Sequence, residues 1–470
     1  MFVLTWYKPD TIFPMTTKRE HQVKVANLVK QFSELTNNNL QAATDKKTTN
    51  LFRGRKQKNI KRLNMRELNN VISIDKAKKI AVVEGMCTYE TLVAETLRYN
   101  LMPAVVPQLK TITLGGAVTG IGIESSSFRY GFPHETVTEM EILTGYGKVE
   151  TAQPTGKHKD LFFGFPNSYG TLGYSLSLTI KLVPVKKFVR TRYIKFARAK
   201  DYFMAIKNAC DTSMWDNEKV DFIDGVVFGP REMYMVLGTM VSDAPYTHDY
   251  TYKKIFYKSI QTRQEDYLTI SDYIWRWDTD WFWCSKNLKA QNPIIRRIYG
   301  KNRLKSEFYM KLFGIEAKFH PVGTLNKILR RPKRETVIQD VEVPIQSAET
   351  FLKFFNQIIG IRPIWNCPVK QLNPKQEWTL FTMKPSQLYV NFGFWDSAPS
   401  KPNWPEGYLN RKIELMVDKL NGKKSLYSDS FYTKQEFSRL YNGKSYDILK
   451  AKYDPNGKFK DLYQKTVKKG

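Results

Sequence analysis

The chain has 470 residues, of which 42% are hydrophobic and 14% aromatic, so it can bury a substantial core and is not a disordered protein. Lysine and arginine number 74 against 45 aspartates and glutamates, a formal net charge of +29. This excess attracts anionic partners such as nucleic acid, an anionic membrane surface or a phosphorylated ligand, although a generally lysine-rich composition explains the count equally well.

The placement of cysteine, histidine and apolar residues excludes several classes of protein. The four cysteines lie far apart without a CxxC pair, which disfavours a disulfide scaffold and favours a reduced, cytoplasmic setting. The histidines are scattered as well, and we expect no metal site. The start, MFVLTWYKPDTIFPM, does not resemble a signal peptide, and no window of roughly 18 apolar residues exists. We therefore expect a cytoplasmic protein that is soluble or peripheral to a membrane.

The first part of the chain alternates helical and strand patterns. Apolar residues recur at helical spacing from Val25 to Leu35, and Val71–Gly85 is typical of strand, turn and strand. Thr88–Asn100 predicts a helix, and Thr138–Ala152 predicts a hairpin. In Tyr174–Val185 leucine and isoleucine alternate with serine, threonine and lysine, which predicts a strand with one apolar and one polar face.

The composition changes near residue 188, after which tryptophan and tyrosine become frequent. Strand patterns occur in VDFIDGVVFG, EMYMVLGTMV and QLYVNFGFW, and a helical pattern runs from Phe351 to Ile359. KQEFSRLY and SYDILKAKY, near the C-terminus, are helical in pattern too. The sequence therefore predicts an α+β protein of two closely associated parts.

The segment TLGGAVTGIGIESSSFRYGFPHE, from Thr113 to Glu135, is unusually rich in glycine and serine. It lacks the third glycine and the apolar helix of a Rossmann fingerprint, and it contains neither the GK[ST] of a P-loop nor a Gly-x-Ser-x-Gly elbow. The remaining interpretation is a long loop. Its main-chain N–H groups can hold a pyrophosphate, and its missing side chains let a flat ring lie against the backbone.

This loop and its surroundings resemble a known family. TITLGGAVTGIGIESSSFRYGFPHETVTEMEILTGYGKVET, followed by DLFFGFPNSYGTLGYSLSLTIKL, resembles the PCMH-type flavin domain of the vanillyl-alcohol-oxidase superfamily, in its Δ24-sterol reductase-like branch. Further segments, among them KKTTNLFRGRK, RPIWNCP, YVNFGFW and SLYSDSFYTKQEFSRLY, follow in family order from about Lys46 to the C-terminus.

The resemblance implies a domain organisation. We expect a two-part PCMH-type FAD-binding domain of two α/β subdomains over residues 1–187, and a mixed α+β cap or substrate domain over residues 188–425. A C-terminal helical segment over residues 426–470 is expected to pack back on the FAD domain.

The resemblance also implies which residues contact FAD. The glycine-rich segment matches the family's FAD-contacting loop, SYGTLGYSLSLTI matches a later flavin-contacting turn, and KKTTNLFR occupies the place of the first phosphate loop. The cofactor-binding residues expected on this basis are Thr113, Gly115, Gly116, Gly120, Gly122, Ile123, Glu124, Ser125, Ser126, Thr171, Leu172, Gly173, Thr48, Thr49, Asn50 and Arg53.

The chemistry implied by the resemblance is flavin-mediated reduction. Many oxidases of the superfamily bond their flavin to a histidine, but no histidine lies between His21 and His134 here, so we expect noncovalent FAD. NADPH is the expected electron donor, and the expected substrate is an isolated C=C bond of a lipid, either a sterol Δ24 bond or a methylene-branched fatty acyl chain. Tyr130, Glu124 and Cys367 are candidate catalytic proton donors, although Glu124 suits a structural role and Cys367 a core position equally well.

Several alternatives stay open from the sequence. The chain could be an oxidase or dehydrogenase of an alcohol, sugar or lactone instead of a reductase. The tryptophans of DYIWRWDTDWFWC fill a core or else meet a membrane interface, and the basic runs RGRKQKNIKR and RRPKR are solvated surface or else contact anionic lipid. A peripheral contact with an anionic membrane thus accompanies the lipid-substrate hypothesis. No nucleic-acid partner is expected, because the lysines are dispersed and no nucleic-acid-binding motif occurs.

Overall fold

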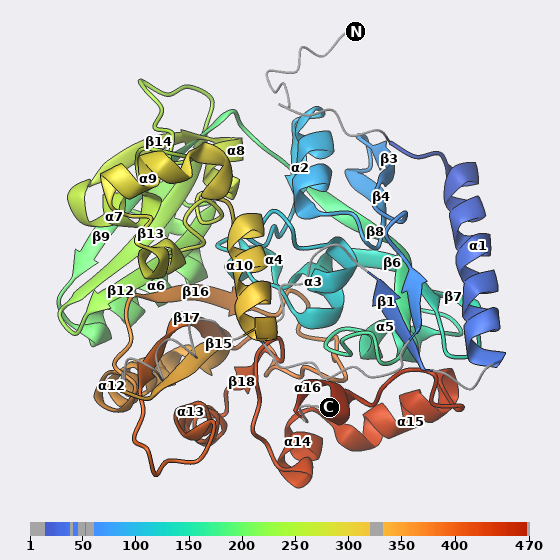
Figure 1. The fold of residues 1–470 in the computed structure, drawn as a ribbon. Helices are drawn as coiled ribbons and strands as arrows, with labels where there is room; N and C mark the ends of the chain where they lie inside the picture. The colour runs from blue at the N-terminus through green and yellow to red at the C-terminus, as the bar shows by residue number, and fades with distance from the viewer. Residues whose placement is uncertain (1–14, 38–40, 46–51, 53–60, 320–331, 468–470) are drawn as a thin grey trace, which may run out of the picture.

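The computed structural model describes residues 15–37, 41–45, 52, 61–319 and 332–467. Two antiparallel sheets dominate the fold, one in each half of the chain, and they lie beside each other (Figure 1). A small parallel pair, β1 (Ala42–Asp45) and β2 (Lys61–Asn64), packs on one end of the first sheet. This mixed architecture confirms the predicted α+β class, with an FAD-binding domain followed by a further α+β part.

The first sheet has the order β3-β4-β8-β6-β7, and β5 pairs with the far end of β8. Its longest strand, β8, lies in the middle because its alternating residues are buried on both faces. The strands and the two helices beside them are β3 (Val71–Asp75), β4 (Ile80–Glu84), β5 (Leu101–Pro103), β6 (Val137–Leu143), β7 (Val149–Ala152), β8 (Tyr174–Pro184), α1 (Lys18–Asn37) and α2 (Tyr89–Leu97).

Every element predicted in this part of the chain is present, but the polar face of β8 is not exposed. Ser175 and Ser177 are buried. Ser177 donates a hydrogen bond to Glu141 on β6, and the Ser175 side chain lies against the main chain of Gly85 and Gly115. The alternation of apolar and polar residues correctly predicted a strand, yet small serines here mark close packing by other segments rather than contact with water.

The second sheet has the order β14-β9-β13-β12-β16-β17-β15-β18. One face carries the helices α6 (Ala199–Thr212), α12 (Ala348–Ile358) and α13 (Tyr408–Lys419), which share a hydrophobic core with it. Its other face belongs to the same core as the first sheet, and this core joins the two halves of the molecule. The strands are β9 (Phe188–Phe196), β12 (Phe222–Gly229), β13 (Glu232–Val241), β14 (Glu265–Thr269), β15 (Arg334–Pro344), β16 (Ile364–Lys370), β17 (Leu388–Pro399) and β18 (Lys423–Lys424).

Short helices and turns connect the sheets and cover their junction. In the first half these are α3 (Leu114–Gly120), α4 (Ser127–Tyr130), η1 (Pro133–Thr136) and α5 (Lys159–Gly164). The second half adds the short pair β10 (Met214–Trp215) and β11 (Glu218–Lys219), followed by α7 (Phe256–Thr262), α8 (Ile270–Ile274), η2 (Cys284–Leu288), α9 (Pro293–Tyr299), η3 (Lys301–Arg303), α10 (Ser306–Phe319) and η4 (Ile345–Ser347).

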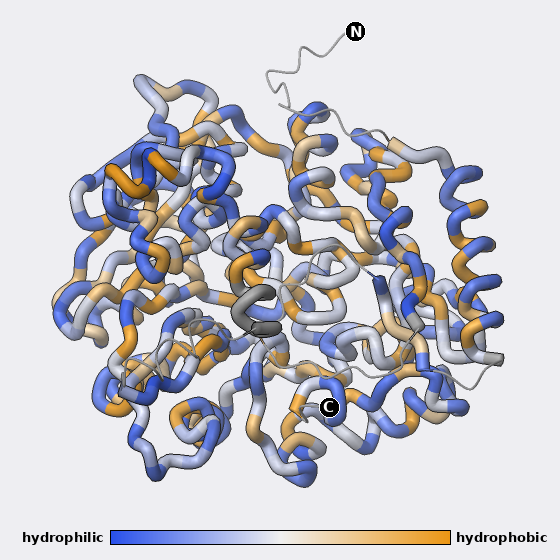
Figure 2. Tube along the Cα trace, in the orientation of Figure 1, coloured by the Kyte–Doolittle hydropathy of each residue, from blue (hydrophilic) through white to orange (hydrophobic). Residues whose placement is uncertain are grey.

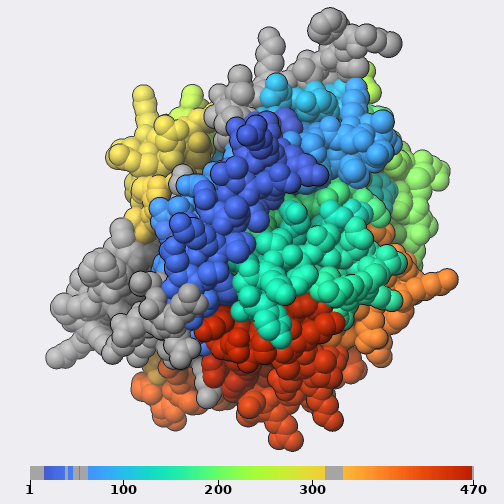
Figure 3. All heavy atoms as spheres, turned by 90° about the vertical axis from the view of Figure 1, so that its right-hand side faces the viewer, coloured from blue at the N-terminus to red at the C-terminus, as the bar shows by residue number. Residues whose placement is uncertain are grey.

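The C-terminal segment returns to the first half of the molecule. Its helices are α14 (Lys434–Leu440), α15 (Gly443–Tyr453) and α16 (Leu462–Thr466), which confirms the helical patterns near the end of the chain. Tyr453 and Lys452 of α15 donate hydrogen bonds to Asp160 of α5, each at 2.7 Å. In Figure 3 these red C-terminal atoms lie directly against the green atoms of the first half.

The fold corrects one sequence expectation and decides between two alternatives. The glycine-rich segment is not one long loop, because Leu114–Gly120 forms the helix α3, whose residues Ala117 and Val118 are buried in the core. The tryptophans of DYIWRWDTDWFWC do not lie at a membrane interface: Trp275, Trp277, Trp281 and Trp283 are all buried. No helix in the described part of the chain combines the length and the apolar character required to cross a bilayer.

Candidate functional site

Helix α3 begins at a position where only glycine fits. The Thr113 side chain caps the helix by accepting a hydrogen bond from the Gly116 N–H at 3.2 Å. The Gly115 N–H donates to the Gly85 carbonyl at 2.9 Å, and a Cβ on Gly115 would lie 2.7 Å from that carbonyl oxygen. Thr113, Gly115 and Gly116, all predicted FAD residues, therefore hold the start of α3 directly against the end of the first sheet.

The chain after α3 turns sharply and approaches its neighbours closely. Ile121 has a φ of 59°, which a β-branched residue adopts only under constraint. A Cβ on Gly122 would lie 2.9 Å from Pro107, and one on Gly120 would lie 3.4 Å from the Tyr169 ring. Glycine at these positions lets Pro107 and the Tyr169 ring pack directly against the backbone of the segment.

The second predicted flavin segment packs against the backbone of the glycine-rich segment. The Tyr169 N–H donates to the Thr119 carbonyl at 3.0 Å, and the Tyr169 hydroxyl donates to the Gly120 carbonyl at 2.9 Å. Positive φ angles at Asn167, Tyr169 and Gly170 make the tight turn that brings the two segments together. Thr171 and Leu172 are fully buried at the end of this turn, and Gly173 leads into β8. The structure thus joins the glycine-rich segment and the SYGTLG turn, both of which are predicted to contact FAD.

The serines that follow the glycines anchor the loop to the second sheet. Ser126 donates a hydrogen bond to the Ala104 carbonyl at 2.7 Å, and the Ser125 carbonyl accepts one from the Ile223 N–H of β12 at 2.8 Å. Ile123 is buried in the shared core. These predicted FAD residues therefore lie at the junction of the two halves.

A buried ion cluster completes this junction, and the sequence analysis had identified only one of its members. Arg276, which is fully buried, donates through Nη2 to Glu124 Oε1 at 3.1 Å and to Asp224 Oδ2 at 2.8 Å. Asp224 Oδ2 also accepts from the indole N–H of Trp365 at 3.1 Å. We call Glu124, Asp224 and Arg276 the junction cluster. Burial raises the pKa of Glu124, although Arg276 acts in the opposite direction.

The other two predicted proton donors are placed differently. Tyr130 is half-buried at the end of α4. Cys367 is buried on β16, the strand against which α4 packs, and burial raises the pKa of its thiol well above the ordinary range. The same burial keeps Cys367 protonated, so it is a poor nucleophile. Its neighbourhood includes Glu124 and Asp224.

The face of the second sheet that points toward the first half carries acidic and amide side chains from adjacent strands. Cys367, Asn391 and Glu342 are register partners across β16, β17 and β15, so their side chains share one row on this face. Gly393 and Asp340 continue the neighbouring row. The sequence analysis did not single out Asp340 or Glu342. We call these two residues the β15 pair.

The β15 pair has neutral hydrogen-bond donors. Asp340 accepts from the Asn391 amide and from the Tyr427 hydroxyl, each at 2.8 Å, and Glu342 accepts from the Ser425 hydroxyl at 3.2 Å. Burial raises the pKa of Asp340 to about 6, despite these two donors. Burial, with Asp340 close by, raises the pKa of Glu342 well above its usual value.

The C-terminal segment brings Tyr427 to this face. The Tyr427 hydroxyl accepts from the Trp395 indole at 3.0 Å, and its ring lies close enough to Tyr169 for an electrostatic interaction. The Phe52 N–H donates to the Tyr427 carbonyl at 2.9 Å. Phe52 belongs to KKTTNLFR, so the predicted first phosphate loop meets the C-terminal segment here. The other predicted residues of that loop, Thr48, Thr49, Asn50 and Arg53, lie outside the described residues.

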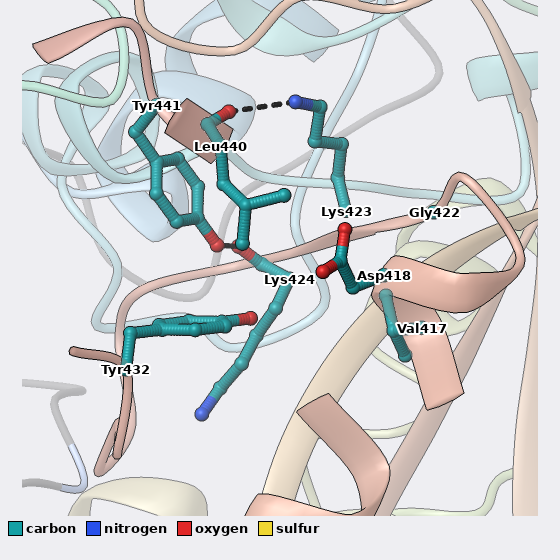
Figure 4. A pocket seen from close by; sticks show the side chains of 8 residues that line it. All are labelled: Val417, Asp418, Gly422, Lys423, Lys424, Tyr432, Leu440 and Tyr441. Carbon is teal, nitrogen blue, oxygen red and sulfur yellow. Dashed lines mark hydrogen bonds between the residues drawn. The ribbon is translucent and has the colours of Figure 1, made fainter. Parts of the chain in front are cut away.

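A shallow crevice near the C-terminus is not a candidate site (Figure 4). The Lys423 amine donates to the Leu440 carbonyl at 2.7 Å, and the Tyr441 hydroxyl donates to the Lys424 carbonyl at 2.8 Å. These bonds tie β18 to α14 across the crevice. Residues 417–441 line it, and none of the predicted FAD or catalytic residues takes part.

Known proteins are similar to this chain over most of its length. A family model described as "FAD binding domain" matches residues 24–153. The chain is 25% identical over 425 residues to a Delta(24)-sterol reductase homolog of Caenorhabditis elegans, covering 86% of this chain and 78% of that protein. It is 26% identical over 437 residues to the human Delta(24)-sterol reductase, covering 90% and 80%, and 27% identical over 440 residues to that of Arabidopsis thaliana, covering 86% and 76%.

Residues 24–153 thus match an FAD-binding domain, and over most of its length the chain is similar to the Δ24-sterol reductase branch of the vanillyl-alcohol-oxidase superfamily.

The junction of the two halves fits FAD. Two buried polar groups next to the residues that pack on the glycine-rich segment have no hydrogen-bond partner among the described residues: Ser168 Oγ, next to Tyr169, and Gln108 Nε2, next to Pro107. A dinucleotide lying along α3 and the SYGTLG turn supplies acceptors for such groups. The residues placed to hold it include the Thr113–Ser126 segment and the Thr171–Gly173 turn. Noncovalent attachment stays a prediction.

Proposed function

We propose that this FAD-dependent oxidoreductase reduces an isolated C=C bond of a lipid with NADPH as the electron donor. The substrate class is a sterol Δ24 bond or a methylene-branched fatty acyl chain. One observation carries the proposal: the similarity to proteins named Delta(24)-sterol reductase extends over most of this chain and includes both sheets. The overall reaction converts the alkene, NADPH and one proton into the saturated lipid and NADP⁺.

The flavin, when bound, accepts hydride from NADPH and passes it to one carbon of the alkene. The protein has to supply the proton for the other carbon and to keep both reactants in place. In this proposal the Thr113–Ser126 segment and the Thr171–Gly173 turn hold the cofactor at the junction, and the aromatic residues of the second sheet supply the apolar surroundings that a lipid substrate needs.

We assign proton delivery to the β15 pair. A general acid works best when its pKa lies near the working pH, and the pKa of Asp340 is about 6. Asp340 is half-buried, on the face of the second sheet that points toward the first half of the molecule. The Tyr427 hydroxyl donates to Asp340 and accepts from the Trp395 indole. Glu342 lies two residues along β15 on the same face, and burial raises its pKa as well. Glu124, Tyr130 and Cys367 remain alternative donors, and Glu124 is the least free of them because Arg276 holds it.

The test is a reduction assay with the FAD-loaded protein. NADPH should bleach the flavin under anaerobic conditions, and a Δ24 sterol or a methylene-branched acyl phospholipid should then gain the mass of two hydrogens. Asp340→Asn should keep flavin bleaching by NADPH but slow lipid reduction by about 100-fold or more, the usual value of a general acid. Glu349→Gln, on the exposed surface of α12, is the matched control and should leave both steps unchanged.

Two results would contradict this proposal. If an alcohol, sugar or lactone bleaches the flavin and NADPH does not, the protein is an oxidase or dehydrogenase of the same superfamily. If Asp340→Asn reduces the lipid at the wild-type rate, the β15 pair is not the proton donor, and Glu124, Tyr130 and Cys367 should then be replaced in turn.

A further inference from the structure

Helix α9 presents two large apolar side chains to solvent. Ile294 is 73% exposed and Ile298 is 72% exposed, more than any other large hydrophobic residue that the structure describes. They are four residues apart and therefore lie on the same face of the helix. Figure 2 shows α9 with orange, apolar stretches at the outer edge of the molecule, and the yellow atoms of this region project from the left edge in Figure 3.

The helix is fixed in this orientation by its opposite face. Arg296 is 4% exposed and forms a bidentate ion pair with Asp280, with N–O distances of 2.6 and 2.8 Å. It also donates to the main-chain carbonyls of Ala290 and Tyr252. Asn292 caps the first turn by accepting from the Ile294 N–H at 3.0 Å. Because rotation of α9 would break a buried bidentate pair, the two isoleucines cannot turn inward.

The surface around the isoleucines is basic. The sequence from Ser285 to Ser306 contains no aspartate or glutamate, and the Tyr252 carbonyl bound by Arg296 places two more lysines beside α9. The acidic groups close by are Asp280, which is buried and pairs with Arg296, and the half-buried Asp272, which interacts with Lys301 and the exposed Asp249. The exposed basic residues, none of which has an ion pair within the described part of the chain, are Lys253, Lys254, Lys289, Arg297, Lys301 and Arg303.

We propose that α9 and these basic residues form a docking surface for an anionic lipid bilayer. In this arrangement Ile294 and Ile298 enter the boundary between head groups and acyl chains, and the lysines and arginines contact the lipid phosphates. The proposal rests on the proposed function, since an enzyme that acts on a lipid has to collect it from a bilayer, but the docking itself requires no turnover. The buried tryptophans take no part in it.

The charge argues for a bilayer over a second copy of this chain. In a symmetric dimer the same patch meets itself, so the basic residues of one copy would face those of the other. A bilayer with anionic lipid offers an apolar layer for the isoleucines and negative charge for the basic residues around them. The formal net charge of +29 strengthens the same attraction.

Vesicle binding tests the proposal with the FAD-loaded full chain. Vesicles of phosphatidylcholine with phosphatidylserine should sediment the protein, and vesicles of phosphatidylcholine alone should bind much less of it. Ile294→Asn with Ile298→Asn should weaken binding by roughly 100-fold, about 10-fold for each side chain that no longer enters the bilayer. Arg297→Glu with Arg303→Glu should weaken binding to anionic vesicles as well. The matched control is Ile448→Asn, which removes a 69% exposed isoleucine from α15 and should change nothing.

The outcomes separate this proposal from the catalytic one, because the vesicles contain neither NADPH nor a reducible lipid. Unchanged vesicle binding by the double isoleucine variant, or an equal loss with Ile448→Asn, would overturn the docking surface. So would a dimer that the double isoleucine variant dissociates, since a second copy would then cover α9. If docking is correct, the double isoleucine variant should also reduce detergent-dispersed substrate normally while losing activity on the same substrate in vesicles.

Discussion

Two groups of buried carboxylates face the centre of the molecule, and they are stabilised in different ways. In the junction cluster, one buried arginine serves both Glu124 and Asp224. In the β15 pair, Asp340 and Glu342 have hydrogen bonds from neutral amide and hydroxyl groups, and no ion pair to either is found in the described part of the chain. A permanent cation holds charges in place, whereas neutral donors leave a carboxyl free to gain and lose a proton.

Because of this difference, we propose a structural role for the junction cluster and a catalytic role for the β15 pair. The junction cluster connects the loop after α3 to β12 and to the chain after α8, so its bonds span the two halves of the molecule. The β15 pair lies on a single strand and ties together fewer segments. Removing the cation from the first region should therefore cost stability, and removing the charge from the second should change the response to pH.

The largest expected effect is that of Arg276→Leu. Without the guanidinium, Glu124 and Asp224 are left buried without a cation, which typically costs about 3–5 kcal/mol of the free energy of unfolding. Urea denaturation of the purified protein measures this loss. Arg129→Leu is the control from the same loop: Arg129 pairs with Asp221, but Lys219 also pairs with Asp221, at 2.9 Å. Its loss should cost only about 1–2 kcal/mol. Equal losses in the two variants would mean that Arg276 contributes no more to the free energy of unfolding than Arg129 does.

A third group of carboxylates is paired with a histidine, a cation that can lose its proton. His21 of α1 lies between Glu84 and Glu141, at 3.0 and 3.2 Å. Burial lowers the pKa of His21, but the hydrogen bonds to Glu141 and Glu84 outweigh it and raise the pKa to about 9 from 6.5. The folded protein therefore binds this proton more tightly than the unfolded chain. The resulting stabilisation, about 3.5 kcal/mol, is complete below pH 6.5 and is lost as the pH rises through 9.

His21→Gln should remove this dependence. The difference in free energy of unfolding between the wild-type protein and the variant should be about 3.5 kcal/mol larger at pH 6 than at pH 10. The Arg129→Leu protein, which retains His21, should differ from the wild type by the same amount at both pH values. A constant difference for His21→Gln across this range would show that His21 does not titrate as the geometry requires.

Much of the fold could be predicted from local patterns. The alternation along β8 and the helical spacing from Val25 to Leu35 depend on neighbours in the sequence, and both elements formed as expected. Helix α3 was missed because three of its residues are glycines, which lower helix propensity. Its cap at Thr113 and its burial against the sheet offset that cost, and the burial depends on β8, some sixty residues later in the chain.

The site was only partly predictable, and the reason is long-range packing. The glycine-rich motif predicted the cofactor segment. Arg276 was not predicted, because it stands in a run of aromatic residues whose most evident pattern is its tryptophans. In other sequences too, a single charged residue inside a run of aromatic residues indicates a buried ion pair. Asp340 and Glu342 alternate with Val341 and Val343 on β15, a pattern typical of a strand with one face in water. Tyr427 and Ser425, which lie far later in the chain, contact these two carboxyl groups, and no local pattern contains this information.

The smallest expected effect is that of Asp340→Asn on the pH dependence of stability. Burial raises the pKa of Asp340 to about 6 from 3.8, so the folded state holds this proton more tightly than the unfolded chain. The wild-type protein should therefore lose at most about 3 kcal/mol from this group as the pH rises from 4 to 7. Asparagine resembles the protonated acid and carries no charge, so the variant should gain stability relative to the wild type over that range. Denaturation at pH 4 and pH 7 measures the change, with Glu349→Gln as the exposed control. A difference between Asp340→Asn and wild type that does not change with pH would mean that Asp340 is ionised throughout, which would make the β15 pair resemble the junction cluster and remove its role as a proton source.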